Sequence, residues 1–362
     1  MKSAVIRVSL LVVGGLLVTS CYDNNDYNFT PYSWDSGVVV ADFDGDGTLD
    51  VAVAQTYVNG GSPNPGFVTI YLQTSPGTFA APVQYPVCPN PWALASGDLT
   101  HNSHVVPPVA PGVDLVVTCP NTAPGVPDSG QISILLHDPS HPGAFLKAQT
   151  LNTGGSGDAV AIGDVTGNGL ADIAVADASV SDAHAILFLN STTSPGTFSA
   201  PVSLSLGVSR GSNDVTIHDM DGDGRGDIVM AVSDGVAILY DNGAGSFLSP
   251  VFVAAGINPQ GVAVADVDGD GRPDIVVANA GYSFVGGFGG ASVTVLRQVV
   301  AGSFSSASVA VPDGAVQPVI ADLDHDGLLD IGVLSFDFLD IDGDGQSQVS
   351  ILRQTAATPG SF

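Results

Sequence analysis

The hydrophobic and polar positions of this chain recur in one pattern, which is an apolar run, a loop rich in Asp and a second apolar run. The pattern reads VVVADFDGDGTLDVAVA at residues 38–54. It returns at 160–176, 215–231, 262–278 and 318–334, with a degraded copy at 93–118. The first Asp residues of successive copies lie between 47 and 66 positions apart (219 to 266, and 98 to 164). The chain is therefore built from repeats of about the size of a small sheet.

A second phrase fills each interval between the Asp loops. It is an apolar strand, a turn of the form Gly-x-Phe and another strand, as in VTIYLQTSPGTFAAPVQYPV at 68–87. Each repeat thus predicts four short strands separated by Gly, Pro and Asn turns. Four strands per repeat favour the blades of an all-β propeller, whereas the repeats of a stacked solenoid are usually shorter.

The number of blades follows from the number of copies. Six copies predict six four-stranded blades, and seven remain an alternative if residues 22–36 hold further structure. The chain ends at Phe362 in a Gly-x-Phe turn, with no following strand. We expect residues 28–34 to supply that strand, because a blade built from both ends of the chain would leave no free sheet edge.

The charge of the chain is strongly acidic. It has 36 acidic residues, all of them Asp, against 8 basic residues, for a net charge of −28. Such a balance argues against nucleic acid as a partner, since phosphates are bound by Lys and Arg, and against electrostatic docking on anionic lipid. The short side chain of Asp suits tight turns and metal-binding loops.

The Asp residues follow the spacing D-x-D-x-D-G-x-x-D. In the first copy Asp42, Asp44 and Asp46 lie two positions apart in a tight turn, and Asp50 starts the next strand. Ligands that are all oxygen, in a flexible loop, suit Ca²⁺ better than Mg²⁺. The backbone carbonyl at the seventh position, Thr48 in this copy, can add another oxygen. The matching sets are Asp219, Asp221, Asp223, Arg225 and Asp227; Asp266, Asp268, Asp270, Arg272 and Asp274; and Asp322, Asp324, Asp326, Leu328 and Asp330.

Three further stretches depart from this spacing. One copy replaces two carboxylates and predicts weaker binding, with Asp164, Thr166, Asn168, Leu170 and Asp172. The degraded copy offers Asp98, Thr100, Asn102 and Asp114, interrupted by a Pro-rich insertion. A last string, Asp340, Asp342 and Asp344, has Gln348 where the fourth Asp would stand. We expect about five to seven Ca²⁺ ions in all.

The motifs DFDGDGTLDVAVA and DVDGDGRPDIVVA, together with the Gly-x-Phe turns, closely resemble FG-GAP/VCBS repeats. These repeats are found in integrin α-subunit propellers and in many bacterial surface proteins. The resemblance covers nearly the whole chain after the N-terminus and implies a Ca²⁺-binding β-propeller. It leaves the function open, because the family serves adhesion, lectin-like binding, enzyme scaffolds and assembly.

The N-terminus predicts export. Lys2 and Arg7 precede an apolar run that is too short to span a bilayer, and the run ends in small residues followed by Cys21. Residues 1–20 resemble a lipoprotein signal peptide, with Cys21 lipidated and the protein anchored in the bacterial cell envelope. A plain signal peptide is the alternative. Residues 22–362 then form one propeller domain. Cys88 and Cys119 predict a disulfide in an oxidising compartment, or two separate buried thiols.

The predicted ligand surface lies on the long, irregular loops at the other end of the blades. These loops carry aromatic residues suited to stacking on sugars or seating a protein: Tyr57, Tyr282, Phe284, Phe336 and Phe338. We expect a non-catalytic, calcium-stabilised binding or adhesion module for glycan or protein at the cell envelope. The alternatives are a polysaccharide lyase or hydrolase on a propeller scaffold, and a structural subunit of an envelope assembly. The sequence does not determine the oligomeric state.

Overall fold

The computed structural model describes most of the chain between residues 32 and 362. The described residues are 12–13, 16–17, 32–58, 64–101, 112–120, 130–177, 183–207, 211–284, 287–312, 314–335, 348–354, 360 and 362. Among them, no helix has the length and apolar character needed to cross a membrane. They form strands joined by turns, as the alternation of apolar runs and turn residues predicts.

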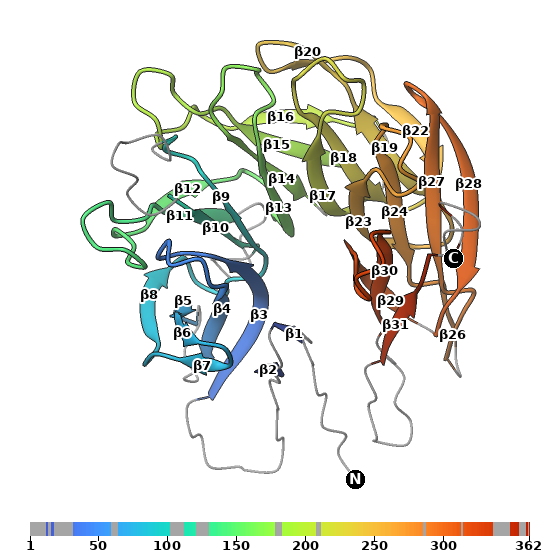
Figure 1. Ribbon diagram of the computed structural model, residues 1–362. Coiled ribbons are helices and arrows are strands. Elements are labelled where there is room, and N and C mark those ends of the chain that lie inside the picture. The colour runs from blue at the N-terminus through green and yellow to red at the C-terminus, as the bar shows by residue number, and fades with distance from the viewer. Residues whose placement is uncertain are drawn as a thin grey trace. The chain divides into compact units, whose positions relative to one another are not determined.

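The chain divides into two compact units. The N-terminal unit comprises residues Ile6–Ser179 and His184–Ser205, and the C-terminal unit comprises Met1–Val5, Val180–Ala183 and Leu206–Phe362. In the described residues, each unit contains three larger antiparallel sheets that follow one another along the chain, besides short hairpins. Figure 1 shows the strands in colours that run with residue number.

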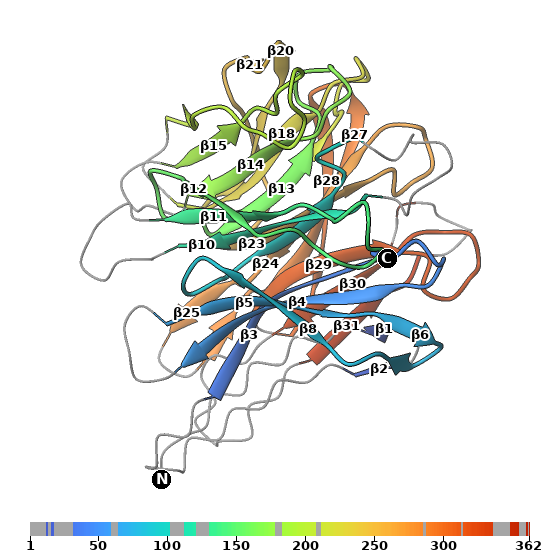
Figure 2. The ribbon, with the colours of Figure 1, turned by 90° about the vertical axis from the view of Figure 1, so that its left-hand side faces the viewer.

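Three four-stranded sheets make up the described part of the N-terminal unit. Strand order follows chain order in each, and Figure 2 shows the strands of the first sheet side by side. The first sheet has β3 (Tyr32–Ala41), β4 (Asp50–Val58), β5 (Gly66–Tyr71) and β8 (Val83–Val87). The second has β9 (Leu94–Gly97), β10 (Asp114–Cys119), β11 (Gln131–Leu135) and β12 (Gln149–Asn152). The third has β13 (Ala159–Gly163), β14 (Asp172–Asp177), β15 (His184–Phe188) and β16 (Val202–Ser205).

The C-terminal unit repeats this arrangement. Its first sheet has β17 (Ser212–His218), β18 (Asp227–Val232), β19 (Gly235–Leu239) and β22 (Val251–Ala254). Its second has β23 (Pro259–Ala265), β24 (Asp274–Asn279), β27 (Ser292–Val300) and β28 (Ser303–Ala310). Its third has three described strands, β29 (Ala315–Ala321), β30 (Asp330–Ser335) and β31 (Gln348–Leu352).

Short hairpins complete the described strands. Two of them form at Gly-x-Phe turns, β6 (Gln73–Ser75) with β7 (Thr78–Phe79) and β20 (Asp241–Gly243) with β21 (Ser246–Phe247). The other two are β25 (Tyr282–Phe284) with β26 (Gly287–Gly289) and β1 (Val12–Val13) with β2 (Leu16–Leu17).

The core lies between neighbouring sheets within each unit. The second strand of a sheet is buried along its whole length in β10, β14, β18 and β24, which explains why these strands are continuous apolar runs. The fourth strand is mostly exposed in β12 and alternates between half-buried and exposed positions in β22. An outer strand has only one covered face, so only every second side chain needs to be apolar.

The predicted fold class is confirmed: the protein is all-β, with four-stranded antiparallel blades and acidic loops between the first and second strands. The expectation that residues 28–34 complete the last sheet is wrong for residues 32–34. Tyr32 pairs with Val58 and Trp34 with Thr56, so these residues extend β3 in the first sheet. The reason is that β4 continues to Val58 and offers them backbone partners. Residues 28–31 lie outside the described residues, and the single domain over 22–362 stays a prediction.

Candidate metal centres

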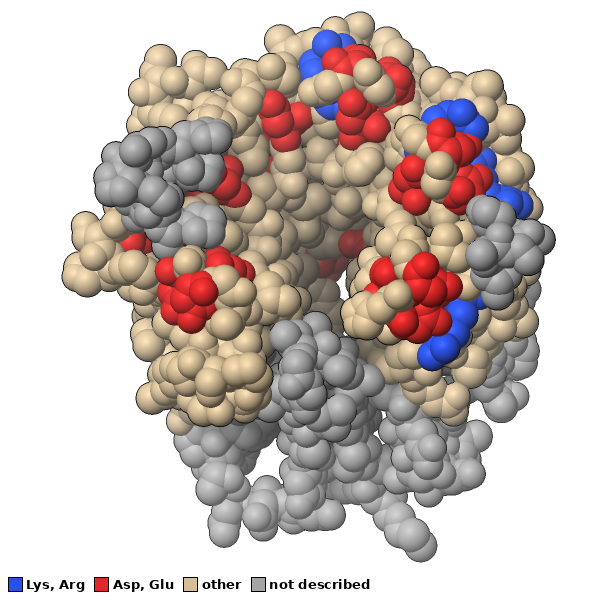
Figure 3. Space-filling model, viewed as in Figure 1, with Lys and Arg blue, Asp and Glu red and all other residues tan. Residues whose placement is uncertain are grey.

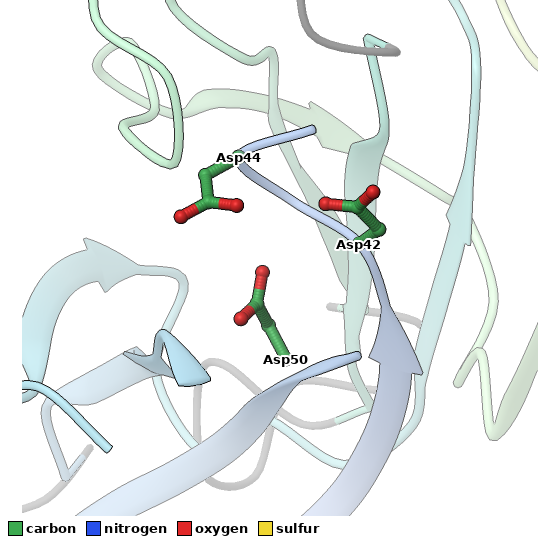
Figure 4. Close-up of side chains that lie close together, drawn as sticks. All are labelled: Asp42, Asp44 and Asp50. Atoms are coloured by element: carbon green, nitrogen blue, oxygen red, sulfur yellow. The ribbon is translucent and has the colours of Figure 1, made fainter. Parts of the chain in front are cut away.

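Among the described residues, four Asp loops bring three carboxylates together. In the first loop Asp42 and Asp44 follow β3, and Asp50 begins β4. Figure 4 shows their carboxylates pointing toward one another. In each group the oxygen atoms lie within 4.8 Å of one another, so each could hold a metal ion. The other groups are Asp219, Asp221 and Asp227; Asp266, Asp268 and Asp274; and Asp322, Asp324 and Asp330.

The first Asp of each loop holds the turn together through backbone amides. Asp42 accepts hydrogen bonds from the N–H of Gly45 at 2.6 Å and of Gly47 at 2.9 Å. Gly47 has a φ of 88°, a conformation that an L-residue with a side chain rarely adopts. The Gly of the motif therefore lets the chain fold back around the first carboxylate, and the carboxylates two positions apart come to face one point.

The third Asp of each loop does not belong to these groups of three. Its carboxylate accepts the N–H of the seventh residue, as Asp46 does from Thr48 at 2.7 Å, and this forms an Asx turn. Asn168 accepts the N–H of Leu170 at 2.8 Å in the same way, which explains why an amide can replace the carboxylate there. The same bond links Asp223 to Arg225, Asp270 to Arg272 and Asp326 to Leu328.

The fourth Asp is a buried bridge between three segments of its sheet. Asp274 is fully buried and accepts the N–H of Val267 at 3.0 Å and the N–H of Gln298 at 2.8 Å. It thus joins the Asp loop, the start of the second strand and the end of the third strand. The same pair of bonds occurs at the fourth Asp of every described loop: Asp50, Asp114, Asp172, Asp227 and Asp330.

Burial dominates the acid–base behaviour of these carboxyls. It raises the pKa of Asp172, Asp227 and Asp274 to about 6, although backbone N–H donors oppose the shift. Burial also raises the pKa of Asp44, and the neighbouring charges of Asp46 and Asp42 raise it further. The cost of holding these groups ionised would be offset by a bound cation.

The donor set fits a hard cation. Each group of three offers only carboxylate oxygens. The third Asp and the backbone carbonyl of the seventh residue lie in the same loop, and carboxylate and carbonyl oxygens are the ligands that Ca²⁺ takes. Figure 3 shows acidic side chains gathered in separate groups, several of them bordered by Lys or Arg. Arginine side chains also pair with Asp residues of the loops, since Arg225 pairs with Asp223 and Asp241, and Arg353 pairs with Asp324 at 3.2 Å. Arg272 also pairs with Asp270.

The structure describes some residues of the remaining predicted sites and not others. Asp164 closes its loop by accepting N–H groups of Thr166, Asn168 and Gly169, as Asp42 does in the first loop. Asp98 accepts the N–H of His101 at 2.6 Å, and Asn102 lies outside the described residues. Six further predicted residues also lie outside the described residues: Asp340, Asp342, Asp344, Phe336, Phe338 and Cys21. Tyr57 is 38% exposed, while the side chains of Tyr282 and Phe284 are not described.

Sequence reasoning missed a polar side chain at the end of each third strand. The amide of Asn190 donates to the carbonyls of Leu99 at 2.7 Å and Ala171 at 2.8 Å, and its oxygen accepts the N–H of Gly196. Leu99 lies in the Asp loop of the preceding sheet. The equivalent positions are all buried: Gln73, His137, Asp241, Gln298 and Gln354. A signal exists in the sequence, because each stands six or eight positions before the Phe of its turn.

The two cysteines named from the sequence are joined. Cys88 follows β8 and Cys119 ends β10, with an S–S distance of 2.02 Å and a Cα–Cα distance of 6.0 Å. Both sulfurs are buried in the core between the first two sheets. The disulfide therefore ties the outer strand of one sheet to the second strand of the next.

One stretch of the chain matches a known protein family. Residues 219–277 match the FG-GAP-like repeat family. Over these residues the chain is similar to an FG-GAP-like repeat. The matched stretch contains two complete Asp loops, from Asp219 to Asp227 and from Asp266 to Asp274, with β18, β19 and β22 between them. No curated protein has a sequence that matches this chain.

Several solved structures resemble the chain at low identity. A lectin of Agrocybe aegerita, described as recognising non-reducing terminal N-acetylglucosamine, is 20% identical, with a TM-score of 0.51 over 92% of this chain and 82% of the lectin. An exotype rhamnogalacturonan lyase is 13% identical, with a TM-score of 0.49 over 89% of this chain and 56% of the lyase. The biofilm matrix protein Bap1 of V. cholerae is 14% identical, with a TM-score of 0.34 over 90% and 70%. At these identities the lectin shows the fold alone, and this chain spans little more than half of the lyase.

Proposed function

We propose that this protein is a non-catalytic, calcium-stabilised module that binds glycans at the bacterial cell envelope. The observation that carries the proposal is the Asp triad, which recurs in four sheets at the end where the first strand meets the second. Four cations bound there would fix one end of the sheets. The loops between the second and third strands, at the other end of each sheet, are then available for recognition.

Glycan is the favoured ligand for two reasons. The lectin from Agrocybe aegerita shares the fold over most of both chains, and that lectin is described as recognising N-acetylglucosamine. Tyr57 is exposed close to the loop between β4 and β5, where an aromatic ring can stack on the apolar face of a sugar. The aromatic residues predicted in the other loops remain candidates for the same role.

A binding role also agrees with the chemistry of the buried carboxyls. The groups with a pKa of about 6 in the Asp loops would suit general acid catalysis by this value alone. In Asp172, Asp227 and Asp274, however, both oxygens accept backbone N–H groups and the side chains are almost fully buried. A substrate has no access to them, so we assign them to holding the loops together.

The cellular setting stays part of the proposal. Export through residues 1–20 and lipidation of Cys21 would anchor the protein in the envelope by one acylated terminus, without a membrane-spanning segment. The disulfide between Cys88 and Cys119 fits an oxidising compartment.

A glycan array tests the proposed function. The protein is applied in calcium and in EDTA, beside a variant with Asp219→Asn and Asp221→Asn, which keeps the buried bridge at Asp227. We expect calcium-dependent binding to a defined class of sugar and weaker binding by the variant. Failure to bind any sugar in calcium, with the protein shown to be folded, would overturn the proposal.

A further inference from the structure

The N-terminal unit contains a groove whose lining residues include none of the Asp triads. It has a volume of about 520 Å³, which is within the range of small-molecule sites. One wall is the end of β8, from Tyr85 to Pro89, and the other wall comes from β11 and from the segment that leads into β12. The groove therefore lies where the outer strand of the first sheet meets the second sheet.

The walls of this groove are held in place by bonds between the two sheets. The hydroxyl of Tyr85 accepts the N–H of Phe145 at 3.2 Å, and the two rings meet edge to face at 5.5 Å. Cys88 is fixed by its disulfide to Cys119, and its N–H donates to the hydroxyl of Ser133 at 2.9 Å. A site fixed in this way loses little conformational entropy when a ligand binds.

A single cation lines the groove. Lys147 is the one Lys or Arg between residues 8 and 209 of a chain whose net charge is −28. Its side chain is exposed, and in the described part of the chain no carboxylate pairs with it. Arg225, Arg272 and Arg353, by contrast, each pair with an Asp in a metal loop. Among the described residues, Lys147 is thus a positive charge without an ion-pair partner.

The repeats show that this cation replaces small residues. In three other repeats the Phe of the turn is followed by two residues and Pro: Ala80-Ala81-Pro82, Ser199-Ala200-Pro201 and Leu248-Ser249-Pro250. Here Phe145 is followed by Leu146, Lys147 and Ala148. Leu146 is 45% exposed and lines the groove beside Lys147. The second sheet therefore places a Lys beside an apolar side chain, whereas these other repeats have Ala or Ser at the position of the Lys.

We propose that this groove binds an acidic saccharide, with the sugar carboxylate on Lys147. The inference rests on the proposed glycan-binding function. The apolar face of the sugar ring would lie against Tyr85 and Leu146. The side chains of Gln131 and Thr150, which also line the groove, would meet its hydroxyls. Gln131 donates its amide N–H to Asn152 at 3.0 Å, which leaves its carbonyl oxygen as an acceptor.

Charge complementarity selects the acidic ligand. The field of a protein with 36 acidic residues disfavours anions over most of its surface. A carboxylate is attracted where a cation stands without an acid partner. A neutral sugar would gain the ring contacts but not the ion pair.

The test compares trigalacturonate with its methyl ester, which has the same body without the charge. Titration of the full chain should give an affinity for the acid about two- to fivefold higher than for the ester, which is the range that an exposed ion pair contributes. Lys147→Gln should remove this preference. Val202→Asp, at an exposed position of β16, changes the net charge by the same amount and should retain the preference.

A direct readout comes from the lysines themselves. The chain contains only Lys2 and Lys147, so ¹³C-methylation gives two lysine signals in an NMR spectrum, and Lys147→Arg assigns them. Trigalacturonate should shift the Lys147 signal and leave the Lys2 signal in place. Equal affinity for the acid and the ester, or an unmoved Lys147 signal in a sample that binds the acid, would overturn the inference. Binding of neutral sugars alone would overturn it and leave the proposed function intact, whereas no sugar binding would overturn both.

Discussion

The side-chain amide of Gln298 donates to the backbone carbonyl of Met220, which lies 3.0 Å away and 78 positions earlier in the chain. Met220 belongs to the Asp loop of one sheet, and Gln298 lies in β27 of the next sheet. The same relationship links Gln354 to Val267 at 2.8 Å. In these pairs the Asp loop is tied to the sheet that follows it in the same unit, so cation binding there and the packing of the two sheets are coupled.

Replacement of Gln298 by Leu should lower the free energy of unfolding by about 1–3 kcal/mol for each buried carbonyl left without a donor. The carbonyls affected are those of Met220 and Pro273. Urea unfolding of the full chain measures the change. Gln260→Leu is the matched control, because that amide bonds only to the adjacent Asn258 and Pro259. An equal loss in both variants would contradict the role of the inter-sheet bond.

Asp274→Ala should destabilise the protein even when calcium is absent. The substitution leaves the N–H groups of Val267 and Gln298 buried without an acceptor, at a cost of about 1–3 kcal/mol each. Unfolding in EDTA separates this effect from metal binding. Asp270→Ala, in the exposed part of the same loop, should cost less under these conditions. If the two variants were equally stable in EDTA, the buried bridge would contribute nothing.

Removal of calcium should lower the melting temperature. A cation that binds only the folded state stabilises it by mass action, by about 2.7 kcal/mol for one site at a hundredfold excess over its Kd. Calorimetry with and without EDTA measures the shift, and elemental analysis counts the bound ions. Mg²⁺ should restore less stability than Ca²⁺, because it dehydrates reluctantly and demands octahedral geometry. The same melting temperature in EDTA and calcium would refute the metal assignment.

His137 should make stability depend on pH near neutrality. Its Nδ1 lies 2.9 Å from the buried carboxylate of Asp114, and this hydrogen bond raises the pKa of His137 above its usual 6.5 despite burial. A raised folded-state pKa gives stability that is fully present below about pH 6.5 and is lost as pH rises through the higher value. The stability difference between wild type and His137→Gln should therefore shrink from pH 6 to pH 9. A difference that stays constant over this range would contradict the prediction.

Loss of the disulfide should destabilise the N-terminal unit. The bond closes a loop of 31 residues, and the chain-entropy relation gives about 3–4 kcal/mol for a loop of this length. The variant with Cys88→Ser and Cys119→Ser should unfold at lower urea concentration than the oxidised wild type. Wild type in reductant should move in the same direction. Unchanged unfolding in both would show that the bond does not constrain the unfolded chain.

The sequence predicted the Asp loops because their chemistry is local. Asp42, Asp44 and Gly47 stand within six positions of one another, so their spacing and the conformation of Gly47 are enough to turn three carboxylates toward one point. The strands could be predicted for the same reason, since each apolar run has the length of a strand and turn residues stand at both of its ends. The different roles of the third and fourth Asp residues of a loop could not be predicted, because the two residues look alike in the sequence. Only burial at the start of the second strand gives Asp50 and Asp274 their bridging role.

What the sequence by itself determined is thus the repeat, the class of fold and the acidic loops, all of which rest on residues near one another in the chain. The tertiary structure decided the contacts between distant segments. Gln298 reaches Met220, and Tyr85 reaches Phe145 across 60 positions, only because neighbouring sheets pack face to face. The groove beside Lys147 exists for that reason alone. Folding brings the exposed Lys147 and Leu146 beside Tyr85, which the spacing of these residues along the chain does not indicate.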